Sequence, residues 1–86
     1  MSMVAERKPM AESHVAGIAC TGRYGEALAW CVICIRARKN ASKENLTMRQ
    51  RAYADLLHIG WTPEELDKLE QHTVDNGLYG LETQYT

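Results

Sequence analysis

The sequence predicts an all-α fold, in which three or four short helices surround a central apolar helix at about residues 25–38. Two observations carry this prediction. Nine consecutive residues, from Ala27 to Ile35, lack any charge, amide or hydroxyl group, whereas the rest of the chain is more polar. The apolar residues outside this run recur at spacings of three and four, which is the period of one helix face.

The chain has 86 residues, the length of a single domain. Apolar residues make up 45% and charged residues 24%, as in folded rather than disordered chains. We expect a flexible N-terminal arm over 1–9, one helical domain over 10–77, and a C-terminal tail over 78–86 that can dock on this domain. Such a short chain buries only about 60–65% of its unfolded surface, so a partner subunit would add stability.

A first helix is expected over 10–20, because Pro9 suits the first turn of a helix. Its buried face follows helical spacing and would carry Val15, Ile18 and Ala19. Residues 21–25 contain two glycines, which predict a tight connection to the next helix. A kink within one long helix over 10–38 is the alternative.

The central helix is expected to be buried on two sides. With a turn of about 100° per residue, one packing arc of about 120° holds Ala27, Leu28, Cys31, Cys34 and Ile35. A second apolar patch, formed by Trp30, Ile33 and Ala37, points elsewhere and needs its own cover. Either the other helices or a second chain could supply this cover, and we predict a partner or dimer interface at these three residues.

The third helix is expected to run from Met48 to about His58. Thr47 and Gln50 have the spacing of a capping box at its start, and Gly60 suits the residue after its end. The inner face of this helix would carry Met48, Ala52, Leu56 and Ile59.

The segment from Thr62 to Glu65 is the strongest local signal in the chain. A threonine cap, a proline at the first helical position and a glutamate three residues after the cap predict a helix start. This fourth helix should run to about Val74 and end at Asn76-Gly77, on the outside of the fold, since its apolar stripe is thin. In the tail, the residues expected to dock are Leu78, Tyr79 and Leu81.

The net charge of the chain is only −1, and this value excludes a uniformly basic nucleic-acid binder. The basic and acidic residues are nevertheless segregated along the chain. Over 36–51, six basic residues oppose one acid; from residue 55 onward, seven acids oppose one lysine. Such a chain can pair head to tail with itself or offer one charged face to a partner, and two solvated helix faces are the alternative. The candidate charged partner-binding face consists of Arg36, Arg38, Lys39, Lys43, Arg49 and Arg51.

The third and fourth helices, joined across Gly60, also match a helix-turn-helix loosely. The helix in the recognition position carries five acids and one lysine, and these acids would repel phosphate groups. A pair of packing helices is therefore the favoured interpretation. If the protein binds DNA or RNA, we expect the contact at the basic segment 36–51.

Cys31 and Cys34 form a C-x-x-C pattern, but the apolar middle of a helix disfavours a redox role. A zinc-stabilised module is a further alternative, with ligands His14, Cys20, Cys31 and Cys34. Buried structural cysteines are the favoured interpretation, and no metal or other cofactor is predicted. Three cysteines are an odd count, and we find neither a secretory signal nor an apolar run of membrane-spanning length, so we predict a cytoplasmic protein without membrane contact.

No catalytic motif emerges from the sequence. The three histidines stand apart from any acid–nucleophile pattern, and there is no phosphate-binding loop or dinucleotide fingerprint. We therefore predict a small non-enzymatic interaction protein, such as a regulator, an adaptor or an inhibitor, that binds a protein partner and forms a homodimer. A DNA- or RNA-binding regulator and a zinc-stabilised module are the alternatives.

Overall fold

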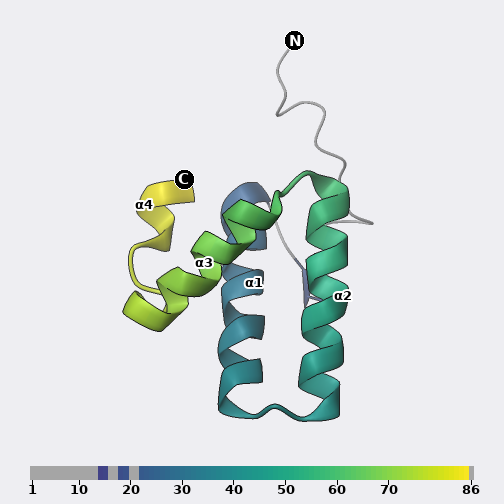
Figure 1. Cartoon of the computed structure of the whole chain (residues 1–86). Helices are drawn as coiled ribbons and strands as arrows, with labels where there is room; N and C mark the ends of the chain where they lie inside the picture. The colour runs from purple at the N-terminus through teal and green to yellow at the C-terminus, as the bar shows by residue number, and fades with distance from the viewer. Residues whose placement is uncertain (1–13, 16–17, 20–21, 86) are drawn as a thin grey trace.

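The computed structural model describes residues 14–15, 18–19 and 22–85, and within these residues four helices form a small bundle (Figure 1). This arrangement confirms the predicted all-α class. In chain order, the elements are β1 (His14–Val15), β2 (Ile18–Ala19), α1 (Gly22–Lys39), α2 (Lys43–Ile59), α3 (Pro63–Asn76) and α4 (Leu81–Tyr85). The arm expected over 1–9 lies outside the described residues.

Helix α1 is the centre of the bundle. It packs against α2 on one side and against α3 and α4 on the other (Figure 1). Its buried residues come from both of its apolar sides: Ala27, Ala29, Trp30, Cys31, Ile33, Cys34 and Ala37. The prediction of a central helix buried on two sides is therefore confirmed.

The helix predicted over 10–20 was wrong for the residues of that range that the structure describes. There, β1 and β2 form an antiparallel pair in which His14 lies opposite Ala19 and Val15 lies opposite Ile18. Val15 and Ile18 are β-branched, and this branching favours extended backbone over helix. Three residues at helical spacing were too few to decide between the two structures.

The connection predicted over 21–25 is instead mostly the first turn of α1. Gly22 has a φ of 72° and begins the helix, and Gly25 lies inside it. A glycine inside a helix costs about 1 kcal/mol relative to alanine. Contacts made by Arg23 offset this cost, because its guanidinium lies 4.1 Å from the Trp61 ring centroid and its Nη2 lies 2.6 Å from Glu65 Oε2. Where the structure describes 10–38, a strand pair followed by one helix thus replaces both alternatives.

Helix α2 begins earlier than the capping box at Thr47 predicts. Ser42 is the N-cap, and its hydroxyl accepts a hydrogen bond of 3.2 Å from the Asn45 amide. The Asn45 side chain also donates to the Asn40 carbonyl oxygen at 2.7 Å, which fixes the entry of the chain into the helix. The predicted inner face is confirmed, since Ala52, Leu56 and Ile59 are buried and Met48 packs against the core.

Helix α3 follows the sequence signals closely. Thr62 and Glu65 form the predicted capping box, with Glu65 N to Thr62 Oγ1 at 3.1 Å and Thr62 N to Glu65 Oε1 at 3.0 Å. The helix ends at Asn76, and Gly77 follows with a positive φ of 63°. Its inner face, which carries Leu66, Leu69 and Thr73, is buried against α1.

Only part of the C-terminal tail packs as predicted. Leu81 is fully buried, whereas Leu78 is 41% exposed and Tyr79 is 85% exposed. Tyr85, which the apolar pattern missed, packs its ring 5.7 Å from that of Trp61, and the Arg23 guanidinium lies over both rings. This aromatic cluster and Leu81 hold α4 on the bundle.

Candidate functional site

The predicted partner interface on the central helix is part of the protein's own core. Trp30 and Ile33 are 1% exposed, and Ala37 is 7% exposed. The Trp30 indole Nε1 donates a 3.0 Å hydrogen bond to the carbonyl oxygen of Leu66 in α3, and its ring lies 5.8 Å from that of Tyr53 in α2. The interface prediction for these three residues was therefore wrong, because α2 and α3 of the same chain pack against this second apolar patch.

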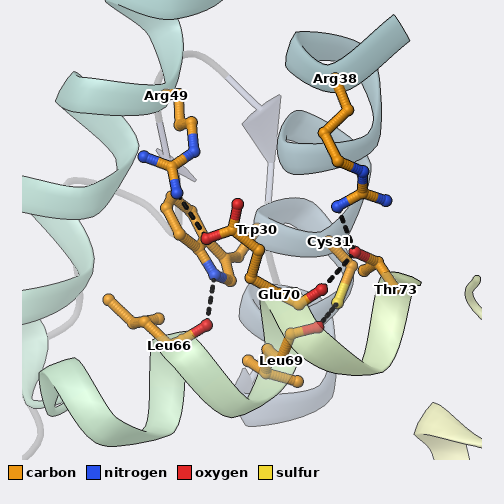
Figure 2. A network of polar contacts seen from close by, with 8 residues as sticks. All are labelled: Trp30, Cys31, Arg38, Arg49, Leu66, Leu69, Glu70 and Thr73. Atoms are coloured by element: carbon orange, nitrogen blue, oxygen red, sulfur yellow. Dashed lines mark hydrogen bonds and ion pairs between the residues drawn. The ribbon is translucent and has the colours of Figure 1, made fainter. Parts of the chain in front are cut away.

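Two of the six basic residues predicted to face a partner belong to a network that ties α1 and α2 to α3 (Figure 2). Arg49 Nη2 lies 2.5 Å from Glu70 Oε1, and its guanidinium carbon lies 5.1 Å from the centroid of the Trp30 ring. Burial lowers the pKa of Arg49, but the nearby Glu70 carboxylate outweighs it and raises that pKa. Arg38 Nη1 donates to Thr73 Oγ1 at 2.8 Å. Two of the six basic side chains therefore make contacts within the chain.

Arg38 is nevertheless exposed, and so are the other four basic residues: Arg36, Lys39, Lys43 and Arg51. Arg36 and Lys39 lie in the last turn of α1, where positive charge complements the helix dipole. Lys43 and Arg51 lie on α2, where they line an open hollow of about 350 Å³ together with Glu44, Thr47 and Met48. This hollow is bounded by two cations and one carboxylate and has a thioether in its wall.

The candidate recognition helix of the helix-turn-helix alternative is α3. The inner side of α3 is core, and the Glu65 carboxylate near its start is paired with Arg23. Burial raises the pKa of Glu65, but hydrogen bonds from Thr62 and Arg23 outweigh it and hold that pKa below its usual value. Glu65 therefore stays ionised but is paired with Arg23, and the charge that is unfavourable for contact with phosphate groups comes from the exposed acids of α3, Glu64, Asp67 and Asp75.

The cysteines of the C-x-x-C pattern are buried inside α1. Cys31 Sγ donates to the Leu69 carbonyl oxygen at 3.8 Å, and burial raises the pKa of Cys31 to about 11. Burial, and then the negative charge of Glu70, raise the pKa of Cys34 to about 12. Thiols with such pKa values are poor nucleophiles and weak metal ligands near neutral pH.

The zinc alternative required Cys20 and the side chain of His14 in addition to this pair, and both lie outside the described residues. Among the residues that the structure does describe, no group of three or more histidine, cysteine or acidic side chains could hold a metal ion.

Three exposed apolar residues lie within six positions at the end of α3 and in the turn after it, a feature that the sequence pattern did not reveal. Within the described part of the chain, three of the four large hydrophobic residues that are exposed lie at this end: Val74 at 59%, Leu78 at 41% and Tyr79 at 85%. An open hollow of about 510 Å³ adjoins them and is lined by Leu78, Tyr79, Gly80, Glu82 and Thr83. Val74 and these five residues are called the C-terminal turn surface below.

Hydrogen bonds hold the backbone of this surface in one conformation. The Tyr79 amide donates to the Asn76 carbonyl oxygen at 3.1 Å, and His72 Nε2 hydrogen-bonds to the Tyr79 carbonyl oxygen at 2.6 Å. Gly77 and Gly80 flank the turn with positive φ angles of 63° and 85°, and residues with a Cβ atom rarely adopt such angles. Those two glycines were the available sequence signal, since a two-residue segment between them cannot pack as part of a helix.

Comparisons with known proteins add no family to this description. No family model matches the chain, and neither the curated proteins nor the solved structures include a significant match. Across the described residues, none of the helices has the length and apolar character needed to cross a membrane.

Proposed function

We propose that the protein is a small non-enzymatic binding protein, such as a regulator, an adaptor or an inhibitor, that holds a macromolecular partner with its C-terminal turn surface. The observation that carries this proposal is the side chain of Tyr79, which is 85% exposed and lines an open hollow together with the exposed Leu78, four positions after the exposed Val74. Single exposed hydrophobic residues are ordinary on protein surfaces, whereas clusters of them mark sites of interaction.

The construction of the turn supports a binding role for Tyr79. Tyrosine is enriched among the residues that dominate interface energetics, because its ring offers a large contact area and few rotatable bonds. The hydrogen bonds that the Tyr79 amide and carbonyl make with Asn76 and His72 already restrain the backbone on both sides of this ring. A preorganised segment loses less conformational entropy when a partner binds, so more of the contact energy appears as affinity.

The same surface favours binding over catalysis. Its side chains are apolar or hydroxyl-bearing apart from Glu82, and a positioned acid–base pair is the minimum that proton-transfer catalysis requires. The buried thiols of Cys31 and Cys34 are unpaired, and free thiols are typical of the cytoplasm. These free thiols support a cytoplasmic location for the proposed binding role.

Quantitative capture from an extract of the source cells tests the proposal. Immobilised wild-type protein is compared with Tyr79→Ala and with the control Gln50→Ala, which removes an exposed side chain of α2 that is remote from the turn. We expect one macromolecule to be retained by wild type and Gln50→Ala, and its recovery to fall by about tenfold or more with Tyr79→Ala, as for loss of an interface hot spot. Equal recovery on all three proteins would contradict the proposal.

A nucleic-acid-binding regulator is the second candidate function, and four exposed basic residues favour it: Arg36, Lys39, Lys43 and Arg51. If these residues contact phosphates, affinity for a nonspecific duplex should fall steeply with salt. Reversal of Arg36 and Lys39 to glutamate should then abolish the mobility shift. The absence of a shift for wild type at low salt would remove this candidate.

A further inference from the structure

We infer that one partner of the C-terminal turn surface is a second copy of this chain, whose α2 hollow receives Tyr79 in a head-to-tail contact. This inference rests on the proposed function, since it uses the same surface. It also assigns a role to the hollow lined by Lys43, Glu44, Thr47, Met48 and Arg51, which the proposed function leaves unused.

The protruding side of the contact is Tyr79. Its ring projects from a turn whose backbone is fixed on both sides, so it can enter a concave surface without prior rearrangement. Glu82 lines the same hollow as Tyr79, Asp75 lies four positions before Tyr79, and both carboxylates are exposed.

The receiving side of the contact is the hollow on α2. Its volume of about 350 Å³ leaves room for one aromatic side chain. Met48 is half-buried in its wall, and thioethers contact aromatic rings favourably. The exposed cations Lys43 and Arg51 line it together with one carboxylate, that of Glu44, and cations can bind the face of a tyrosine ring.

The charges of the two surfaces are complementary. Lys43 and Arg51 belong to the segment 36–51, which carries six basic residues against Glu44, whereas Asp75 and Glu82 belong to the acidic part of the chain. Opposite charges around a small contact steer two molecules into register and disfavour the approach of like ends.

The geometry of the fold directs this contact to another molecule. The turn that follows α3 lies on the side of α1 away from α2, so the ring and the hollow of one chain do not meet (Figure 1). Because the two surfaces differ, the contact is heterologous, and repetition of it produces a closed ring or an open chain of molecules.

Sedimentation velocity over about 10 µM to 1 mM tests the inference, since contacts smaller than standard interfaces are weak. We expect the average mass of the wild type to rise with concentration, and the rise to be reduced by salt. Tyr79→Ala should weaken association by about 30-fold or more, as removal of a central aromatic residue does. The double reversal Lys43→Glu with Arg51→Glu should weaken it similarly, while Lys68→Glu, a charge reversal on the exposed face of α3, should leave it unchanged.

A mixing experiment separates this contact from a symmetric one. Tyr79→Ala retains its hollow and the double reversal retains its tyrosine, so an equimolar mixture should form a one-to-one dimer and nothing larger, although each variant alone is monomeric. A symmetric contact between two turn surfaces predicts instead that the double reversal alone associates like wild type, and that result would overturn the head-to-tail inference.

A monomeric wild type at the highest concentration would also overturn the inference. In that case the proposed function stands if Tyr79→Ala still loses the captured macromolecule, and falls if it does not.

Discussion

Replacement of Trp30 should reduce stability without any direct effect on binding. Its side chain is 1% exposed and lies between α2 and α3, with its indole N–H bonded to the Leu66 carbonyl oxygen and Arg49 over its ring. Trp30→Ala removes this ring from the core, which costs about 3–5 kcal/mol. A chain of this length has a free energy of unfolding of about 4–13 kcal/mol, so the alanine variant loses a large share of its stability.

The milder variant Trp30→Phe isolates the polar part of the same contact. It keeps an aromatic ring but deletes the indole N–H, and with it a hydrogen bond worth about 0.5–1.5 kcal/mol, together with part of the ring volume. The Leu66 carbonyl lies inside α3 and keeps its place in the helical hydrogen-bond ladder, so no buried acceptor is left without a donor. We expect a total loss of about 1–2 kcal/mol.

Urea unfolding followed by far-UV circular dichroism measures both losses. With a slope of about 1.5 kcal/mol per molar urea, Trp30→Phe should lower the midpoint by about 1 M at unchanged slope. The control is Tyr79→Ala, an exposed aromatic truncation that should change the free energy of unfolding by less than about 0.5 kcal/mol. Our reasoning is refuted if Trp30→Ala unfolds like wild type, or if it loses association while its stability is intact.

Three further predictions concern the cap, the thiols and the last helix. Thr62→Ala should cost about 1 kcal/mol of stability through loss of the α3 cap. The Glu65 carboxylate should stabilise the fold above its ordinary pKa of 4.5, and this contribution should be lost as pH falls through the lowered pKa of Glu65 in the folded protein. Glu65→Gln should reduce that loss of stability in acid unfolding curves, and an unchanged curve would contradict the lowered pKa. In a variant without the third cysteine, Cys31 and Cys34 should react with a thiol reagent near neutral pH only after urea is added, and rapid labelling of the native protein would contradict their burial. Leu81→Ala should lower the urea midpoint by the equivalent of about 2–5 kcal/mol, and no change would mean that α4 is not docked.

Sequence reasoning succeeded where local signals and burial agreed. The apolar run of α1, the capping box at Thr62 and the inner face of α2 are each determined by residues within a few turns of one another. It failed where distant contacts decided the outcome. The start of α1 depends on Arg23 meeting Trp61 and Glu65, which are separated from it by about forty positions.

The candidate site was harder to predict for the same reason. An apolar patch such as Trp30 with Ile33 looks alike in sequence whether another helix or another molecule covers it, and here α2 and α3 do so. Conversely, Leu78 and Tyr79 are as apolar as core residues, but the turn between Gly77 and Gly80 leaves them exposed. Among the basic residues, the contacts that Arg38 and Arg49 make within the chain could not be predicted until their α3 partners, Thr73 and Glu70, were located in space.

Photo-cross-linking in the source cells is the most direct test of the claim that the C-terminal turn surface binds a partner. A photoreactive phenylalanine analogue replaces Tyr79 in one variant and Ala54, an exposed residue of α2, in the control. We predict one dominant adduct from position 79 and none of that mass from position 54. The adduct mass also shows whether the partner is a second copy of the chain. Equal, diffuse labelling from both positions would contradict the account.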